Sequence, residues 1–437
     1  MTDQTEKIIV VDSLMGEGKT SFALQYIQRN ADKSFIYCTP FLDEVERVKS
    51  ACPGFIDPKR IDGRKLNGFN SLLERGENIA VTHSTFSDAN DETLKLIREG
   101  HYILILDEVL DILIDFNDVA EVKIRRKDID LLFNEGFIKA DSYGRVSWVK
   151  GHYPGSSYTD VERLANNGAL FYLNETFLVW QFPPEIFRAF DQVFILTFMF
   201  QGSFLRPYFE YHGLNYTMQS VYHDANGGYY LDEFRDVSRQ RKAEIRQLIR
   251  LHDANSTRYK AGSGSKRWYK QATPADLKEL QCKISNFFKN VTKAKTPEIM
   301  WTAPKDFSKY LKGNGYVRRG LTDEEKRQLE HADAETAKRI RDKAECFVPC
   351  NARASNNYRD RRVLIYAINL YVNPYVSRYF ENRNEVDHTD IHVDCEAFAL
   401  QAMLQWVWRS CIRDGKPIEL YIPFKRMRDL LTAWLDG

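Results

Sequence analysis

One stretch near the start of the chain constrains its fold more than any other. Residues 7–12 form a short, mostly apolar and β-branched run that predicts a buried strand. The loop that follows contains Gly16-Glu17-Gly18-Lys19-Thr20-Ser21. Residues 21–27 then have helical spacing. A strand, a glycine-containing loop and a helix in this order are the context of a phosphate-binding P-loop, and a chance strand-to-helix turn would match less of it.

Each residue type in this loop suits a nucleoside triphosphate with its metal ion. Gly16 and Gly18 let backbone N–H groups turn toward phosphate oxygens, and the helix N-terminus adds partial positive charge. Lys19 would reach the β- and γ-phosphates, and Thr20 would give its hydroxyl to Mg²⁺. Ser13 departs from the pattern, because it stands where the first glycine is usual.

Further short apolar runs alternate with helical stretches, so the sequence predicts an α/β fold with a parallel, doubly wound sheet. The expected strands are 34–38, 78–82, 101–106 and 192–197. A helix opened by Thr39-Pro40 is expected after the first of these. Ligands bind at the carboxyl ends of such strands, where the polar residues of this chain fall. The 192–197 strand is expected to lie beside the strand that ends at Asp107.

The acidic pair Asp107-Glu108 follows four consecutive apolar residues. We expect Asp107 to hold the Mg²⁺ of a bound nucleotide and Glu108 to polarise the attacking water. Two carboxylates would be costly in a sealed core, so they need an open edge or a metal ion. The alternative is a solvated acidic loop.

The charge of the chain is uneven, although its formal net charge is only +1. Residues 241–320 hold 19 Lys and Arg against 6 Asp and Glu, and the rest of the chain holds 43 against 55. A basic middle predicts a polyanionic partner, and the alternative is a solvated basic linker. Lys266, Arg267 and Trp268 lie in an expected flexible loop, where cations and a ring suit a nucleic-acid strand. Equally, Trp268 could pack into the core.

The seven cysteines are odd in number and scattered, which favours a reducing, cytoplasmic compartment. The sequence shows neither a signal peptide nor a long apolar run, so no membrane partner is expected. Cys346 and Cys350, or His388, His392 and Cys395, have spacings found among metal ligands. Neither set has a matching second pair, so packing is the preferred interpretation.

The C-terminal part predicts a second α/β unit. It is expected to begin near 297, with a charged helix over 322–344 that is opened by a Thr322–Glu325 capping box, and an apolar helix over 362–370. A helix over 398–413 would place Gln405, Arg409 and Arg413 on one face, since they are four residues apart. They could form an arginine finger in the catalytic site, or a salt-bridge stripe.

With these motifs in place, the chain resembles a superfamily 2 helicase of the DEAD/DEAH-like class, in the compact form carried by phages and mobile elements. The motifs that carry the resemblance are Gly16-Glu-Gly-Lys-Thr20, Thr39-Pro40, Thr82-His83-Ser84, Asp107-Glu-Val-Leu110, Leu196-Thr197, and Gln405 with Arg409 and Arg413. The pattern departs from the family in the Val-Leu after Asp107-Glu108, in the spacing of the two arginines, and in the lack of an upstream glutamine motif for adenine.

The resemblance implies two RecA-like lobes with ATP and Mg²⁺ in the cleft between them. By this resemblance residues 39–40 and 82–84 contact nucleic acid, Thr197 couples hydrolysis to strand movement, and residues 351–358 link the two sites. The expected lobes are 1–215, with a β-containing insertion at about 117–190, and 296–437. A basic linker or accessory region, 216–295, lies between them.

The leading hypothesis is therefore an ATP-dependent helicase or translocase, on DNA rather than RNA, in phage or mobile-element replication or recombination. Proteins of replication or recombination would then be further partners. A terminase-type packaging ATPase is an alternative, and it would need a nuclease site, for which Asp387, Asp390 and Asp394 are candidates. The second alternative is a non-motor ATP-dependent switch.

Overall fold

The structure is a computed structural model that describes residues 7–153, 155, 157–252, 259, 262–350 and 358–437. Contacts divide the chain into two compact units. Among the described residues, the first unit holds 7–13, 17–234 and 372–394, and the second holds 14–16, 235–371 and 395–437. Each unit is built around its own parallel sheet.

The sheet of the first unit has the strand order β13-β12-β1-β11-β5-β2-β4-β3. All neighbouring strands are parallel except β12 and β13, which form an antiparallel hairpin at one edge. The strands are β1 (Ile8–Asp12), β2 (Phe35–Thr39), β3 (Phe55–Ile56), β4 (Asn78–Thr82), β5 (Ile103–Asp107), β11 (Gln192–Thr197), β12 (Tyr216–His223) and β13 (Tyr229–Glu233). The predicted α/β fold with a parallel sheet is confirmed, and β11 does lie beside β5.

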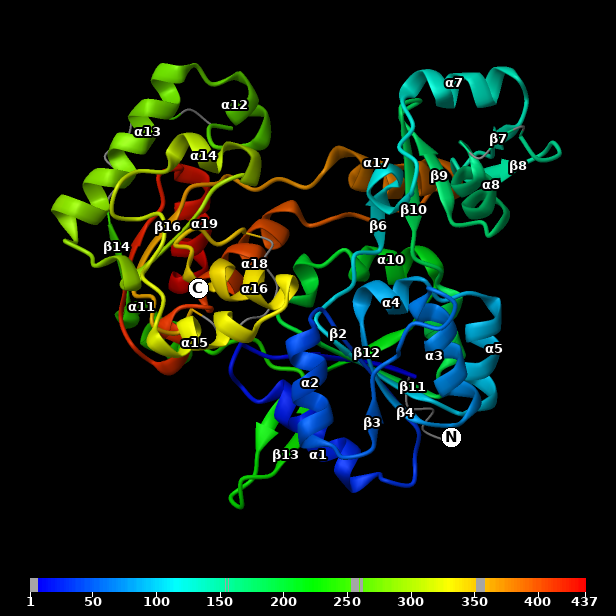
Figure 1. Cartoon of the computed structure of the whole chain (residues 1–437), viewed down its shortest axis with the longest axis horizontal. Helices are drawn as coiled ribbons and strands as arrows, with labels where there is room; N and C mark the ends of the chain where they lie inside the picture. Colours follow the sequence, from blue (N-terminus) through cyan, green and yellow to red (C-terminus); the bar gives the residue numbers. More distant parts are fainter. Residues whose placement is uncertain (1–6, 154, 156, 253–258, 260–261, 351–357) are drawn as a thin grey trace. The chain divides into compact units, whose positions relative to one another are not determined.

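Helices cover both faces of this sheet (Figure 1). On one face, α1 (Lys19–Arg29) and α2 (Leu42–Ala51) pack against alternate strand residues such as Val11 and Tyr37. The opposite face carries Val10 and Cys38 and is covered by five helices. These are α3 (Lys65–Glu74), α4 (His83–Ser87), α5 (Asp91–Glu99), α9 (Glu185–Ala189) and α10 (Leu205–His212). Because side chains alternate between the two faces of a buried strand, the sheet packs against a separate hydrophobic core on each face.

The start of α2 differs from the prediction. Thr39 is the last residue of β2, and Phe41 is the N-cap residue, without a side-chain cap bond. The helix begins at Leu42, because the residue before Pro40 is restricted to extended backbone and Thr39 stays in the strand.

Between β5 and β11 the chain forms a small antiparallel sheet with the order β6-β10-β9, and the hairpin β7–β8. The elements are β6 (Leu113–Asp115), α6 (Phe116–Val119), α7 (Arg126–Asn134), β7 (Ile138–Ala140), β8 (Val146–Trp148), α8 (Thr159–Asn166), β9 (Leu170–Leu173), β10 (Phe177–Gln181) and, after β11, the 3-10 turn η1 (Phe200–Gly202).

One helix of the first unit comes from far along the chain. Helix α17 (Pro374–Asp387) places Val376, Tyr379 and Phe380 in the same core as β9 and α10. The Tyr379 hydroxyl donates to Oε1 of Gln181, and Gln181 Nε2 lies 3.2 Å from His212 Nε2. Figure 1 shows α17 in orange among the cyan and green elements it packs against.

The second unit has a four-stranded parallel sheet with the order β14-β17-β16-β15. The strands are β14 (Ile249–His252), β15 (Ile299–Thr302), β16 (Val363–Tyr366) and β17 (Ile418–Tyr421). The predicted helix over 362–370 is wrong, because Val363–Tyr366 is the central strand β16. A short, fully apolar run fits a buried strand and a buried helix equally well, and here pairing on both sides decides it.

Helices and turns complete this unit. They are α11 (Arg239–Leu248), α12 (Lys266–Gln271), α13 (Pro274–Asn286), η2 (Phe287–Val291), η3 (Thr296–Glu298), η4 (Lys305–Phe307), α14 (Ser308–Leu311), α15 (Asp323–His331), α16 (Ala334–Ala344), α18 (Cys395–Val407), η5 (Cys411–Asp414) and α19 (Lys425–Asp436). On one side of the sheet, α12 and α13 pack against β15 and β16 around Trp301.

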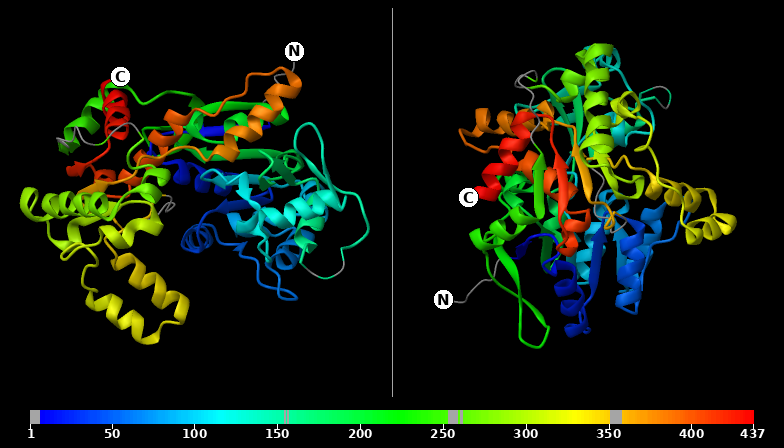
Figure 2. Two further views of the ribbon diagram at one scale, coloured as in Figure 1. Left: turned by 90° about the horizontal axis from the view of Figure 1, so that it is seen from above. Right: turned by 90° about the vertical axis from the view of Figure 1, so that its left-hand side faces the viewer.

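The predicted helix over 322–344 is two helices, which lie side by side (Figure 2). The Thr322–Glu325 capping box is confirmed at the start of α15. The chain then turns, because the Asp333 carboxylate accepts a hydrogen bond from Thr336 N at 2.7 Å and caps a new helix.

Candidate nucleotide-binding site

The P-loop connects the end of β1 to the start of α1, as the sequence predicts. Gly16 and Gly18 have φ values of +93° and +89°, which side chains other than glycine rarely adopt. Gly18 is the N-cap residue of α1, so no capping side chain competes for the first-turn N–H groups. Lys19 Nζ donates to the carbonyl oxygen of Ser13, within the same loop. This geometry fits an anion cradle at a helix N-terminus.

Ser13, which replaces the usual first glycine, fastens the loop to its neighbours. Its backbone N donates to Thr197 O at 3.2 Å, and its hydroxyl accepts from Val221 N at 2.9 Å. These two bonds join the end of β1 to the strands on both sides, β11 and β12. The departure from the pattern therefore gives a sheet contact that a glycine could not make.

The acidic pair lies at the carboxyl end of β5. Asp107 is half-buried, accepts from the Tyr37 hydroxyl at 3.0 Å, and has its carbonyl oxygen 3.0 Å from His83 Nε2. Glu108 has a φ of +66°, and its backbone N donates to Leu196 O at 3.0 Å. A left-handed backbone at a residue other than glycine is uncommon, and here it turns the chain sharply just past the strand.

The charges of this sheet edge influence one another. Burial, together with the negative charge of Glu108, raises the pKa of Asp107 to about 6. Burial lowers the pKa of Lys19, whereas the carboxylates of Glu108, Asp12 and Asp107 act to raise it. Carboxylates held close together in a partly buried site favour a cation, so Asp107 fits the predicted role of Mg²⁺ ligand, with Thr20 at the start of α1 as the second candidate.

Asp12 is part of this edge, although sequence reasoning did not select it. Its carboxylate accepts from Met199 N at 2.9 Å and from Phe200 N at 2.8 Å. It thereby holds the turn after Thr197, where Met199 has a φ of +55°. The only sequence signal was an acidic residue that ends an apolar strand, which is the feature that led to the selection of Asp107.

The residues predicted to contact nucleic acid lie at the ends of β2 and β4. Thr39 is fully buried, Pro40 and Thr82 are half-buried, and Ser84 is exposed. His83 is buried at 7% exposure and contacts the Asp107 carbonyl through its ring. The structure thus brings residues 82–84 next to the acidic pair, and their role toward nucleic acid stays a prediction.

The basic segment around 266 is not a flexible loop. Residues 266–271 form α12, whose N-cap Ser265 accepts a hydrogen bond from Trp268 N at 3.1 Å. Lys266 and Arg267 are exposed, whereas the Trp268 ring packs edge-on against Tyr269 and Phe424. Of the two interpretations of Trp268, the structure therefore shows the packed one.

Gln405, Arg409 and Arg413 do not share a helical face. Helix α18 ends at Val407, and the backbone then turns so that Cys411 N donates to Arg361 O at 3.0 Å. Arg409 follows the helix and is 6% exposed, whereas Arg413 lies in η5 and is half-buried. Gly415, with a φ of +70°, is the C-cap residue of η5. The predicted single helix over 398–413 is wrong. The segment 351–358, except for Tyr358, lies outside the described residues.

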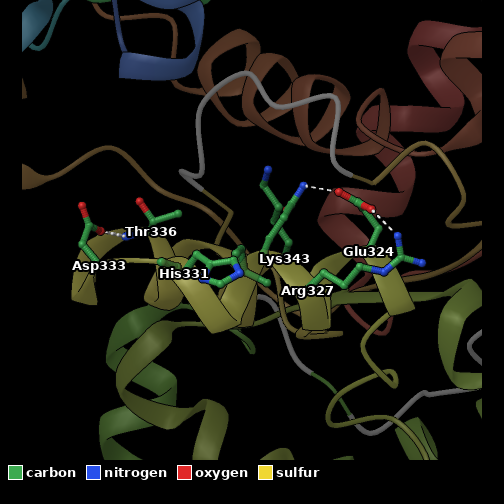
Figure 3. Close-up of a pocket in the computed structure, with 9 residues that line it drawn as sticks. Glu324, Arg327, His331, Asp333, Thr336 and Lys343 are labelled. Carbon is green, nitrogen blue, oxygen red and sulfur yellow. Dashed lines mark hydrogen bonds and ion pairs between the residues drawn. The ribbon is translucent and has the colours of Figure 1, made fainter.

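A separate pocket of about 770 Å³ lies between α15 and α16 (Figure 3). Its polar side chains largely bond to one another: Gln328 Nε2 donates to Glu324 at 3.1 Å, and Arg327 lies 3.8 Å from Glu324. None of the residues selected from the sequence lines it. It therefore gives no support for a second ligand site.

Within the described part of the chain, no group of three or more His, Cys, Asp and Glu side chains is placed to hold a metal ion. Asp387 is instead in contact with Arg383 and accepts from the Tyr143 hydroxyl at 2.8 Å. None of the described helices is long and apolar enough to cross a membrane.

Fold and site together define an α/β protein with two RecA-like lobes, one of which carries a P-loop and an acidic strand end. An XPD chain in its apo form matches with a TM-score of 0.50 at 12% identity, covering 97% of this chain and 95% of that one. Another solved chain, named XPD helicase, matches with a TM-score of 0.46 at 10% identity, covering 98% and 95%.

Sequence comparison identifies the family. A protein of Bacillus subtilis (strain 168), described as SPbeta prophage-derived uncharacterized protein YonV, is 32% identical over 451 residues, covering 99% of both chains. Residues 243–435 match the model of the YonV C-terminal Rossmann-like domain, and 119–180 match that of the YonV middle domain. The chain belongs to the YonV family.

Proposed function

We propose that the chain is an ATP-dependent helicase or translocase that acts on nucleic acid, DNA rather than RNA. The observation that carries this proposal is the sheet edge of the first unit, where a P-loop with two left-handed glycines lies on the same edge as Asp107 and Glu108. This arrangement suits binding and hydrolysis of a nucleoside triphosphate. The order of the motifs along the chain and the two-lobed fold favour a motor over a simple nucleotidase.

Roles follow from the positions of the side chains. Gly16, Glu17, Gly18 and Ser21 would line the phosphates, and Lys19 would bind the β- and γ-phosphates once it leaves the Ser13 carbonyl. Thr20 and Asp107 would hold Mg²⁺, and Glu108 would polarise the attacking water. When bound, Mg²⁺ would neutralise phosphate charge.

The second unit would supply the remaining catalytic group. An arginine finger must reach the nucleotide, so the half-buried Arg413 is a better candidate than Arg409, which is 6% exposed. Gln405 is half-buried near the end of α18 and stays in the proposed catalytic set.

The exposed Ser84 and the half-buried Thr82 and Pro40 would contact the nucleic-acid backbone, and Lys266 and Arg267 would add positive charge. His83 and Thr39 are buried, so they would contribute indirectly, by fixing the positions of the strand ends. The prophage origin of the B. subtilis relative fits a role in replication or recombination of a mobile element, in the cytoplasm of the host cell.

The test is an ATPase assay on the full chain with no nucleic acid, and with single-stranded DNA, duplex DNA or RNA. We expect hydrolysis that DNA stimulates and that Lys19→Ala abolishes without a change in thermal stability. Hydrolysis that persists in a folded Lys19→Ala variant would overturn the site. Nucleic-acid-independent hydrolysis would favour the switch over the motor.

A further inference from the structure

The P-loop is in contact with an aromatic ring from more than two hundred residues away. A Cβ placed on Gly18 would collide with Cδ1 and Cε1 of Tyr229, so the ring lies directly against the backbone of this glycine. Tyr229 is the first residue of β13 and is half-buried. Gly18 is therefore required twice, for its positive φ and for this close approach.

The backbone of the hairpin that carries this ring is hydrogen-bonded to its neighbours along both strands. On β12, Ser220 Oγ donates to Asp12 O at 2.8 Å, just before the P-loop. The neighbouring bond, from Val221 N to Ser13 Oγ, lies beside it. At the helix, Tyr229 N donates to Gln25 Oε1 at 3.0 Å, and Arg29 Nη1 donates to Tyr229 O at 3.3 Å. Figure 1 shows β13 alongside α1.

The hairpin has two aromatic faces. On the P-loop face, His223 is directly opposite Tyr229 in the register, with ring centroids 4.6 Å apart, and His223 is exposed. On the other face, Tyr222 and Tyr230 stack with centroids 5.8 Å apart. Because side chains alternate along a strand, only the first pair can meet a ligand held by the P-loop.

We propose that Tyr229, together with His223, forms the surface that receives the base of the nucleotide whose phosphates the P-loop binds. This inference rests on the proposed function and adds the missing half of its site. A triphosphate at the N-terminus of α1 must extend its nucleoside toward a neighbouring surface. β12 and β13 form the edge of the sheet next to β1, on the side away from β11 and β5.

The chemistry of this surface predicts the specificity. Aromatic rings stack on the flat face of any base and do not read its hydrogen-bonding edge. The larger ring system of a purine gives more contact than a pyrimidine. The site would therefore prefer purine nucleoside triphosphates and distinguish ATP from GTP poorly. It would also replace the upstream glutamine motif for adenine, which the sequence lacks.

The test compares binding of two ligands that share phosphates but not a base. With Mg²⁺ present, ATP and inorganic tripolyphosphate are titrated into the full-length wild type and into Tyr229→Ala, Tyr229→Phe and Tyr230→Ala. We expect Tyr229→Ala to weaken ATP binding about tenfold and to leave tripolyphosphate unchanged. Tyr229→Phe keeps the ring and should bind as wild type. Tyr230→Ala removes a ring from the opposite face and is the matched control.

Other outcomes separate the two proposals. If Tyr229→Ala weakens both ligands equally, or weakens neither, the base-binding inference fails while the P-loop stands. If Tyr230→Ala weakens ATP as much as Tyr229→Ala does, a general effect on the hairpin replaces the inference. If the wild type binds neither ligand and Lys19→Ala changes nothing, the proposed function fails first. Melting temperatures measured on the same samples exclude unfolding as the cause.

Discussion

Two regions are proposed to contact the nucleotide: the P-loop edge of the first unit, and segment 405–413 of the second unit. They differ in how firmly their own unit holds them in place. In the first unit, loops at adjacent strand ends are tied to one another, through Ser13, Asp12 and the backbone of Glu108. In the second unit, the arginine-bearing segment 405–413 changes from helix to turn within a few residues. One region is a prearranged edge, whereas the other places each arginine in a different environment.

The difference shows what a local pattern can determine. A residue that directly follows a buried strand has its position set by that strand, so Asp107 and Thr82 could be located without the fold. A residue near a helix end depends on where the helix stops. Nothing between 405 and 413 is a glycine or proline, yet α18 ends at Val407, whose carbonyl oxygen accepts a hydrogen bond from Ser410 Oγ at 2.7 Å.

The largest expected effect would sharpen the contrast between the two arginines. We expect Arg413→Ala to lower ATP turnover about 10³-fold, the low end for arginine fingers, with an unchanged melting temperature. Arg409→Ala should instead lower the melting temperature by several degrees, because its guanidinium is buried in its own unit. Turnover and melting are measured on the same samples. The reverse pattern would assign the finger to Arg409.

The next effect tests whether the first unit holds a catalytic carboxylate. We expect Glu108→Gln to lower turnover about 10²-fold and to keep ATP affinity, since Gln has the shape of Glu but cannot take a proton. Single-turnover hydrolysis and equilibrium binding of ATP measure the two properties. The control is Asp111→Asn, an exposed carboxylate three residues further along the chain. Loss of affinity in Glu108→Gln would indicate a metal-binding role instead.

A third effect tests the buried contact between His212 and α17, which lies within the first unit. Burial lowers the pKa of His212 to about 3, and the positive charges of Arg188, Arg145 and Arg383 contribute. Below about pH 6.5, His212 becomes protonated in the unfolded chain but stays neutral in the folded one. Stability should therefore fall by on the order of 1 kcal/mol per pH unit between pH 6.5 and 3.

His212→Gln is the matched variant for this effect, because its side-chain oxygen can still accept from Gln181 but does not titrate. Denaturant unfolding at several pH values should show a shallower loss of stability for the variant than for the wild type. Parallel profiles would mean that other groups carry the acid sensitivity of this unit.

The smallest effect concerns the basic surface of the second unit. Replacing Lys266, Arg267 and Lys270 with Gln should weaken DNA binding and make the slope of log affinity against log salt shallower by about 0.7 to 0.9 per lost phosphate contact. All three side chains are exposed on α12. The control set is Lys326, Arg327 and Lys338, exposed cations on α15 and α16. Equal slopes for both sets would mean that α12 is a solvated basic helix with no particular role in DNA binding.

The sequence predicted the elements of the first site well and its connections poorly. The strands, the P-loop and the acidic pair were found because each is a contiguous pattern. Ser13, Asp12 and Tyr229 were missed as partners because their contacts join residues far apart in sequence. In the second unit, β16 was predicted as a helix, since four buried apolar residues carry no periodicity.

Helix α17 gives the first unit a dependence on the order of synthesis. The core that β9 and α10 share is completed by Val376, Tyr379 and Phe380, which the ribosome adds only after residues 235–371. At typical elongation rates this delay is on the order of ten seconds. During it, the nascent first unit presents an unfilled apolar surface to chaperones while strands of the second unit already emerge. A recombinant piece that stops at residue 234 reproduces that unfinished intermediate, so it needs residues 372–394 to complete its core.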